Sequence, residues 1–408
     1  AEPLLAYLRQ VAGVRQAVIA GSYRRARETV GDLDILVTAR SHSAVMSAFL
    51  AWEEVTEVAS QGRTRATVFL RNGLQVDLRV VAPRSYGAAL YYFTGSKAHN
   101  IAVRKLAQKQ GLKINEYGVF RGRKRIAGET EASVFSSVGL PFIAPELREM
   151  RGEIAAAQAG CLPKLICRAD LRGDLHVHSK ASDGSAGIEE MALAARAAGL
   201  EYIAITDHTR NLGIAHGLDP ARLLQQIDEI DRLNERLEGI TLLKGSEVDI
   251  LEDGSLDLPA SVLARLDLVI GAVHTHFGLS RRKQTRRLQR AMESPYFTLL
   301  AHPSGRLLLE REGYEADMQR IIETAAARGC FLELNGQPRR LDLNDSYCKL
   351  AKEAGVLLSI DSDSHGPLQF ENLSTGINQA RRGWLEKKDV LNTRPLSRLR
   401  PLLRATMG

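Results

Sequence analysis

The segments LRGDLHVH at 171–178 and YIAITDH at 202–208 decide the fold of the larger part of this chain. Each is a short apolar run that ends in histidine, and each precedes a helical pattern, at 188–198 and 220–237. Strands that alternate with helices predict parallel β/α units. Five more strand segments follow in the same alternation, so we expect a barrel of seven β/α units. They are 240–247, 268–273, 298–301, 331–334 and 356–360.

Titratable side chains gather at the ends of these predicted strands, where the chemistry of β/α barrels lies. The residues found there are His176, His178, Asp183, His208, Glu247, His274, His302, Asp363 and His365. Imidazoles mixed with carboxylates suit Zn²⁺, Mn²⁺ or Fe²⁺ better than Mg²⁺ or Ca²⁺, and this many donors fit two or three ions. Such a site predicts hydrolysis of a phosphoester by a metal-activated water.

The composition of the 408 residues is that of a globular protein, with 44% hydrophobic and 25% charged side chains. No stretch has the ~18 apolar residues needed to cross a bilayer, so we expect no membrane span. The four cysteines include no C-x-x-C pair, which predicts reduced thiols in a cytoplasmic protein. The chain begins with Ala1 inside a helical pattern, and we expect an internal fragment of a longer protein.

Positive charge is concentrated in the first third of the chain. Residues 1–150 hold 21 basic and 13 acidic side chains, whereas residues 151–408 hold 34 and 35. A basic module of this kind is expected to bind a polyanion, most often nucleic acid. Between the two parts, 139–171 contains three prolines and predicts a connector with one helix at about 145–158.

Three aspartates of the basic part form a second candidate site. Asp32 and Asp34 stand two residues apart at the start of a predicted strand, so their side chains share one face. Asp77 interrupts the apolar strand predicted at 75–81. Carboxylates on neighbouring strands repel one another unless cations neutralise them, and two Mg²⁺ ions would activate one oxygen and stabilise another. An isolated D-x-D pair would merely cap a turn.

The turn before these acids offers a phosphate site. Gly21-Ser22 can present backbone N–H groups to a phosphate, and Arg25 lies nearby as a charge partner. This turn and Asp77 together favour the metal site over a turn-capping pair.

This part of the chain resembles the nucleotidyltransferases of DNA polymerase family X. The resemblance rests on the acids together with YYFTGS at 91–96 and INEYG at 114–118, which mark a polymerase palm and thumb. It implies that Asp32 and Asp34 hold two Mg²⁺ or Mn²⁺ ions, and that Asp77 holds the catalytic metal and helps to activate a primer 3′-OH. The further contacts that it implies are Ser22, Arg25 and Gly31 with the triphosphate, Tyr92 and Phe93 with the sugar, Gly95 and Asn100 with base and sugar, and Arg104 with the template strand.

Two features depart from that family. Lys97 stands where the animal β-type enzymes carry an acid at the base contact. The family's N-terminal lyase-like domain and its DNA-binding fingers segment would precede Ala1, so we expect both to be missing from this chain, together with their gap and 5′-phosphate contacts.

The second part resembles the PHP (polymerase and histidinol phosphatase) domain, on DLHVHS at 174–179, SDG at 182–184 and TDH at 206–208. The resemblance implies three Zn²⁺ or Mn²⁺ sites that share the nine ligands. The first takes His176, His178, Glu247 and Asp363; the second takes Glu247, His274 and His302; the third takes Asp183, His208 and His365. His276 lies outside this set and is a candidate phosphate contact or a partner of the ligands.

Basic residues that follow the site strands are candidates for gripping the DNA backbone. They are Arg282, Lys283, Arg286 and Arg287 in a run after His274, and Arg306 after His302. A solvated helix face is the alternative interpretation of this run.

A palm and thumb followed by a PHP barrel is the order of the bacterial family X polymerases. We therefore expect a multidomain α/β and α+β protein: a nucleotidyltransferase palm with a mixed sheet at 1–85, a thumb at 86–140, a linker at 141–170 and a (β/α)7 PHP barrel at 171–408. The expected function is DNA repair, base excision repair included. The palm would add dNTPs to a primer, and the PHP site would act as a 3′→5′ exonuclease, with 3′-phosphatase and abasic-site cleavage as further activities.

We expect a monomer in the bacterial cytoplasm, associated with the nucleoid, with DNA and dNTPs as partners and no membrane. Two alternatives stay open: a PHP-type phosphatase of small metabolites, and a DNA-binding scaffold with structural metals. The basic first part argues against the phosphatase, and the many ligands around an open pocket argue against the scaffold.

Overall fold

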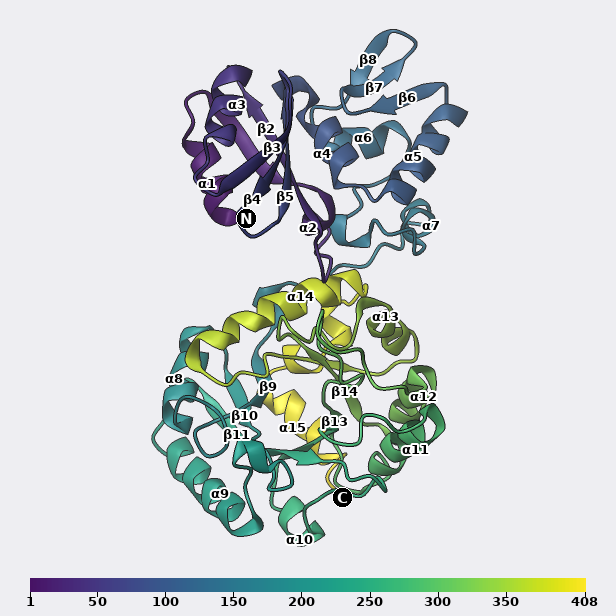
Figure 1. The fold of residues 1–408 in the computed structure, drawn as a ribbon. Coiled ribbons are helices and arrows are strands. Elements are labelled where there is room, and N and C mark those ends of the chain that lie inside the picture. The colour runs from purple at the N-terminus through teal and green to yellow at the C-terminus, as the bar shows by residue number, and fades with distance from the viewer. The chain divides into compact units, whose positions relative to one another are not determined.

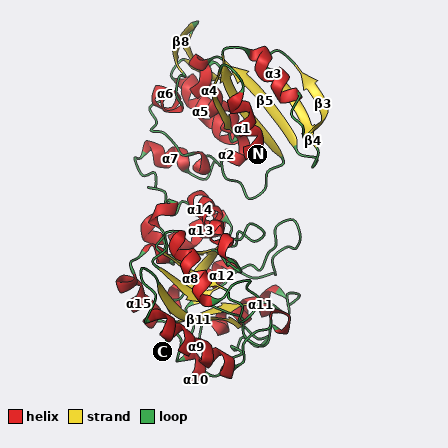
Figure 2. Ribbon diagram, turned by 90° about the vertical axis from the view of Figure 1, so that its left-hand side faces the viewer, coloured by secondary structure: helices red, strands yellow, loops and turns green.

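The computed structural model describes residues 1–408 and divides them into two compact units, Ala1–Leu162 and Pro163–Gly408. Figure 1 labels their helices and strands, and Figure 2 separates helices from strands by colour. Each unit has its own sheets and its own apolar core.

The first unit begins with a five-stranded mixed sheet of order β1-β2-β5-β4-β3. Its strands are β1 (Val14–Ile19), β2 (Asp32–Ala39), β3 (Val55–Gln61), β4 (Arg65–Leu70) and β5 (Gln75–Val81). Only β2 and β5 pair in parallel, and their register sets Asp34 opposite Asp77. The helices α1 (Glu2–Gln10) and α3 (His42–Leu50) bury apolar side chains against this sheet, among them Leu8 and Phe49.

The rest of the first unit is a helical layer with a small antiparallel sheet. The short helix α2 (Gly21–Arg24) joins β1 to β2, and then come α4 (Tyr86–Thr94), α5 (Lys97–Lys109), β6 (Leu112–Asn115), β7 (Gly118–Arg121), β8 (Lys124–Ala127), α6 (Glu131–Ser137) and α7 (Glu153–Gln158). The three strands pair in the order β6-β7-β8.

The segment that joins the two units differs from the connector predicted from the sequence. Residues 141–162 belong to the first unit, and Ile143 and Leu147 are buried there. The single helix predicted at about 145–158 is wrong: a 3-10 turn (Pro145–Leu147) and α7 are separated by Met150 and Gly152, both at positive φ. The cause is a tertiary contact, since the Arg148 guanidinium turns inward to the Glu131 carboxylate.

The second unit is the predicted barrel of seven parallel strands, in the order β9 to β15 around the ring. The strands are β9 (Gly173–Val177), β10 (Tyr202–Ile205), β11 (Thr241–Asp249), β12 (Leu268–Ala272), β13 (Leu299–Leu300), β14 (Phe331–Asn335) and β15 (Leu358–Asp361). A parallel bridge between Val177 and Ser364, with the His178 N–H donating to the Ser364 carbonyl at 2.8 Å, brings the first and last strands together. The seven-stranded prediction is confirmed.

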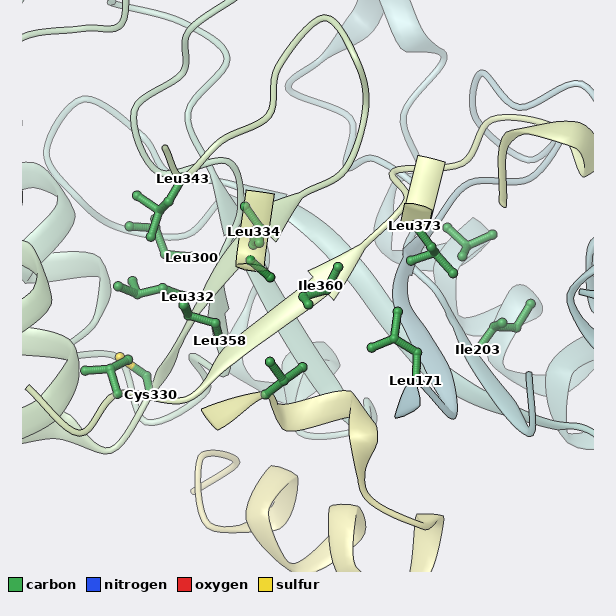
Figure 3. Packing of buried hydrophobic residues seen from close by; sticks show 14 of the residues in the cluster. Leu171, Ile203, Leu300, Cys330, Leu332, Leu334, Leu343, Leu358, Ile360 and Leu373 are labelled. Carbon is green, nitrogen blue, oxygen red and sulfur yellow. The ribbon is translucent and has the colours of Figure 1, made fainter. Parts of the chain in front are cut away.

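Helices surround this ring of strands (Figure 1). They are α8 (Ile188–Ala197), α9 (Pro220–Asn234), α10 (Ala260–Leu263), α11 (Arg281–Ala291), α12 (Met318–Arg328), α13 (Asp345–Glu353) and α14 (Asn372–Arg382). The last helix, α15 (Leu396–Arg404), packs instead against the amino ends of the strands. None of the helices has the length and apolarity needed to span a membrane. Figure 3 shows part of the core that the strands share with them, including Leu332, Leu334, Leu358 and Ile360.

A second apolar cluster fills the inside of the barrel at the amino ends of the strands. Tyr202, Leu268 and Phe331, which open β10, β12 and β14, pack with Leu399 and Leu403 of α15. The C-terminal helix thus closes this end with apolar contacts. Polar side chains are left to the carboxyl ends of the strands, which is where they can meet a substrate.

Candidate active sites

The three aspartates of the first unit lie on the two parallel strands of its sheet. Asp34 and Asp77 are register partners on β2 and β5, and Asp32 opens β2 with its side chain exposed. Burial, followed by the charges of Asp32 and Asp77, raises the pKa of the Asp34 carboxyl to about 6. Burial and the two neighbouring carboxylates thus oppose the ionisation of Asp34, which fits a site that needs cations.

Neighbouring side chains fix the orientation of Asp77. The Thr67 hydroxyl donates to Oδ1 at 2.6 Å, and the Gln75 amide donates to Oδ2 at 2.8 Å. In the turn before β2, Gly21 has φ +60°, and a Cβ at this position would overlap the Asp34 carboxylate. The glycine of the predicted phosphate turn is thus required for the close approach of the turn to the acids.

The other residues predicted to contact the nucleotide or the template differ in their burial and in their contacts. Ser22 is half-buried in α2, Gly31 is exposed just before β2, and Phe93 stacks on the Arg79 guanidinium at 4.4 Å. The Asn100 amide donates to the Tyr92 carbonyl at 2.7 Å. The Arg104 guanidinium donates to the Asn100 carbonyl at 3.3 Å.

Arg25 is buried and already has partners. Its guanidinium donates to the Thr94 carbonyl at 2.6 Å, next to Gly95, and to Glu149 at 3.0 Å.

The nine predicted ligands of the second unit converge at the carboxyl end of the barrel, and Glu247 is at the centre. Its two oxygens lie within 3.5 Å of five imidazoles, those of His176, His178, His208, His274 and His302. Asp363 Oδ1 is 3.3 Å from His178 Nε2 and 3.7 Å from His176 Nε2. Asp183 lies 3.4 Å from His365 Nε2 and 3.5 Å from His208 Nε2.

Potential ligand atoms form three overlapping groups, each compact enough for one ion. The groups are His178 with Asp183, His208 and His365; His176 with His178 and Asp363; and His208 with Glu247 and His274. His178 and His208 each belong to two groups, so this partition differs from that implied by the family resemblance. His302 stays beside the third group through its 2.8 Å contact with Glu247.

The electrostatics of this cluster also fit bound cations. Burial favours a neutral Glu247, but the imidazoles of His208 and His176 hold the pKa of its carboxyl well below the usual range. Burial likewise opposes a charge on His208, yet the Glu247 and Asp183 carboxylates raise the pKa of its imidazole to about 10. In the metal-free chain, protons on imidazoles thus supply the positive charge that the buried carboxylates demand.

Two imidazoles of the cluster are neutral. Burial and the neighbouring imidazoles of His365 and His208 lower the pKa of His178 to about 3. Burial and the Arg340 guanidinium lower the pKa of His302 to about 4. Since a neutral ring nitrogen is the form that ligates a metal, these two side chains are ready ligands.

Two arginines predicted to contact DNA bind backbone carbonyls of the chain itself. The prediction that Arg287 contacts DNA at the surface is wrong. Arg287 is 2% exposed, and its guanidinium donates to the carbonyls of Ile250, Leu251 and Thr275. It faces inward because α11 packs that side on the barrel. The Arg306 guanidinium donates to the carbonyls of Arg340 and Leu341.

The other basic residues of α11 are exposed. Arg282, Lys283 and Arg286 lie on the solvent side of the helix. A cavity of about 610 Å³ between α11 and α12 is lined by Arg281, Arg282, Thr285, Arg286, Gln289, Asp317 and Arg320. His276 is half exposed and lies 3.6 Å from Glu252, apart from the nine ligands.

Comparison with known proteins decides the family. Residues 3–85 match the DNA polymerase beta palm, residues 89–149 the DNA polymerase beta thumb, and residues 174–337 the PHP domain. The chain is 40% identical over 392 residues to the DNA polymerase/3′-5′ exonuclease PolX of Bacillus subtilis (strain 168), covering 94% of this chain and 68% of that protein. The chain belongs to the PolX family.

Two further similarities cover only parts of this chain. A probable phosphatase of Thermoanaerobacter sp. (strain X514) is 30% identical over 232 residues, which is 54% of this chain and 89% of the phosphatase. A crystal structure of Leishmania infantum polymerase beta in a ternary complex has a TM-score of 0.33 and 24% identity, over 36% of this chain and 73% of that chain.

The residues fit the divalent metals that the PolX family requires. In the palm, the donors are carboxylate oxygens, which suit a hard cation such as Mg²⁺. In the PHP domain, imidazoles surround the carboxylates, and neither ring nitrogen of the buried His178 makes a hydrogen bond within the chain. Such nitrogens need a ligand, and a metal ion supplies it.

Sequence reasoning missed the side chains that orient these ligands. Glu333 Oε1 lies 2.7 Å from His176 Nδ1, and Asp249 Oδ1 lies 2.5 Å from His274 Nδ1. Each carboxylate leaves the other ring nitrogen facing the cluster. Glu333 stands inside a buried strand, FLELN at 331–335, so the signal that singled out Asp77 could have found it.

Proposed function

We propose that this chain extends DNA primers at its palm and hydrolyses phosphodiesters at DNA 3′ ends at its PHP domain. The observation that carries this proposal is the presence in one chain of two separate groups of potential metal ligands, one of carboxylates alone and one of imidazoles with carboxylates. Membership of the PolX family supports both activities. The same proposal includes DNA and dNTPs as partners. It also includes a monomeric chain that acts on the bacterial nucleoid.

At the palm, Asp32, Asp34 and Asp77 hold two Mg²⁺ or Mn²⁺ ions. Ions held there would help the primer 3′-OH to attack the α-phosphorus of a dNTP and would neutralise charge on the leaving pyrophosphate. Thr67 and Gln75 keep both oxygens of Asp77 in place, and the Gly21-Ser22 turn offers its backbone to the triphosphate. Tyr92, Phe93, Gly95 and Asn100 border the nucleotide, and Arg104 faces the template.

At the PHP domain, the nine convergent ligands hold two or three Zn²⁺ or Mn²⁺ ions. Ions held there would lower the pKa of a water, which would attack the terminal phosphodiester, break its P–O3′ bond and release a nucleoside monophosphate. Glu247 touches five imidazoles and so joins the ligand groups into one site. Glu333 and Asp249 hold His176 and His274 with one nitrogen toward the site, and Arg282, Lys283 and Arg286 bind the DNA backbone.

A labelled primer annealed to a longer template tests both parts. With Mg²⁺ and dNTPs we expect the primer to lengthen, and with Mn²⁺ and no dNTPs we expect it to shorten from its 3′ end. A 3′-phosphate or an abasic site in the same duplex extends the test to end cleaning. If the protein hydrolyses sugar phosphates but leaves every DNA substrate intact, the small-metabolite phosphatase is the better description.

A further inference from the structure

The most exposed large apolar side chains of the chain lie in segments that follow strands of the PHP barrel. Leu309 is 93% exposed, Ile214 is 91% exposed and Leu368 is 84% exposed, whereas no other large apolar side chain exceeds 58%. Leu309 lies in the hairpin after β13 and its predicted ligand His302. Ile214 lies in a 3-10 turn (Gly213–Ala215) after β10 and His208, and Leu368 lies in a 3-10 turn (Pro367–Glu371) after β15 and His365. Exposed apolar residues are ordinary when scattered singly, but each of these three follows a strand end that carries a predicted metal ligand.

Leu309 is also strained. It sits at the tip of a hairpin closed by the antiparallel bridge between Leu307 and Arg311, and its φ is +62°. A left-handed backbone favours glycine or asparagine, so a leucine there loses stability without gaining a packing contact. Such an outlier in a defined structure points to a function for the side chain.

The hairpin is firmly tied to the loop that follows β14. The Leu308 N–H donates to the Arg339 carbonyl at 2.6 Å, and the Arg306 guanidinium donates to the carbonyls of Arg340 and Leu341. Arg339 and Glu310 form a two-point ion pair across the two segments. We call residues 303–314 and 336–344 together the lip.

The lip borders the metal site. The Arg340 guanidinium lies 3.4 Å from Asp363 Oδ2, and the Asn335 amide just before the lip donates to the same oxygen at 3.0 Å. His302, at the other end, directly precedes the hairpin segment. A hydrogen-bonded segment therefore leads from two predicted metal ligands, His302 and Asp363, to an apolar tip in solvent.

We propose that the lip is a binding subsite for the last nucleotides of a single DNA strand, in which Leu309 packs against the face of an unstacked base. This inference rests on the proposed hydrolysis at DNA 3′ ends. A strand whose terminal phosphodiester enters the metal site must unstack its last bases, and an apolar side chain then covers a base face that is otherwise left in water.

The arrangement of the tips favours a strand over a protein partner. β10, β13 and β15 are not neighbours in the ring, so Ile214, Leu309 and Leu368 come from three separate strand ends. A docked protein needs a continuous apolar area. Separate contacts suit the successive, flexibly joined bases of a strand.

The variant Leu309→Asn tests the proposal, because asparagine tolerates the left-handed backbone and keeps the hairpin intact. Three substrates are compared with Mn²⁺: an oligonucleotide, the same oligonucleotide with abasic residues at its last two positions, and bis(p-nitrophenyl) phosphate. We expect kcat/KM to fall about tenfold on the first substrate only, as loss of one apolar contact with a base predicts. Leu193→Asn, at a 41% exposed position on α8, is the matched control and should leave all three unchanged.

A binding measurement without metal gives a second readout. An oligonucleotide with 2-aminopurine as its 3′-terminal base is titrated with the protein in EDTA, and its fluorescence rises when that base unstacks. The rise should be smaller for Leu309→Asn than for the unaltered protein or the α8 control.

The outcomes separate this inference from the function on which it rests. Unchanged hydrolysis of the oligonucleotide by Leu309→Asn, or an equal loss on all three substrates, overturns the role of the lip alone. If the unaltered protein cleaves bis(p-nitrophenyl) phosphate but neither oligonucleotide, the proposed DNA hydrolysis fails and the lip proposal fails with it.

Discussion

The palm and the PHP domain both gather carboxylates, but they balance the negative charge in opposite ways. In the palm, Asp34 has acidic neighbours, and its pKa is raised to about 6 by burial and by the charges of Asp32 and Asp77. In the PHP domain, the imidazoles of His208 and His176 hold the pKa of the buried Glu247 carboxyl well below its usual range. The palm relies on added cations, whereas the PHP domain carries compensating groups of its own.

This difference indicates how one chain keeps two chemistries apart. Oxygen donors alone select hard cations that also accept the phosphates of a nucleotide. Imidazoles select softer cations that lower the pKa of a bound water more strongly. The donor types thus predict separate metal requirements for addition and for removal of nucleotides.

The largest expected effect is a crossed loss of activity. Asp77→Asn should reduce nucleotide addition by about 10³-fold and leave hydrolysis unchanged, since one metal's contribution of several kcal/mol is lost only in the palm. His178→Ala should do the reverse. Primer extension and primer shortening, measured on the same preparations, check both. If either variant loses both activities equally while remaining folded, the two sites are not independent.

A smaller effect is expected when an orienting carboxylate loses its charge. Glu333→Gln should lower the metal affinity of the PHP domain and its hydrolysis by about 10–100-fold, because His176 Nδ1 loses its carboxylate partner. Metal content after dialysis and the rate on bis(p-nitrophenyl) phosphate check this. Nucleotide addition serves as the control, and retention of full metal content would contradict the assigned role.

Stability of the metal-free palm should decrease as the pH rises. The Asp34 carboxyl has a pKa of 3.8 in the unfolded chain and of about 6 in the folded chain. Between these pH values the folded state therefore holds more protons than the unfolded state. The free energy of unfolding therefore falls from about pH 4 to pH 6 and stays lower above it. Thermal unfolding in EDTA should show a weaker fall for Asp34→Asn, and an identical fall would contradict this cause.

The smallest effect is expected on the surface of α11. Replacing Arg282, Lys283 and Arg286 with alanine should weaken DNA hydrolysis severalfold and reduce the slope of log affinity against log salt by about 2. Hydrolysis of bis(p-nitrophenyl) phosphate should not change. Arg232→Ala, exposed on α9, is the control. Equal loss on DNA and on the small substrate would count against a backbone contact.

Periodic features of the sequence predicted much of this molecule. The strand expected at 75–81 coincides with β5, and the seven barrel strands follow from apolar runs that alternate with helical patterns. The nine polar residues at the strand ends were selected by position and type, and the structure brings them together around Glu247. Such patterns are local, so they can be read without knowing what packs against them.

Other features depend on contacts between distant residues and were not predictable. Arg287 is one of several similar residues in a basic run, and only the packing of α11 on the carbonyl of Leu251 makes it structural. Arg340 lies in a polar loop and gains its position from Asp363, 23 residues later. The helix expected at 145–158 is interrupted because Arg148 is drawn to Glu131.

The most direct test of two separate metal sites is anomalous diffraction from crystals of this chain soaked in Mn²⁺. The account predicts one set of peaks among Asp32, Asp34 and Asp77, and a second set among the nine ligands around Glu247. Peaks in only one of these places, or bound ions whose ligands are other residues, would contradict it.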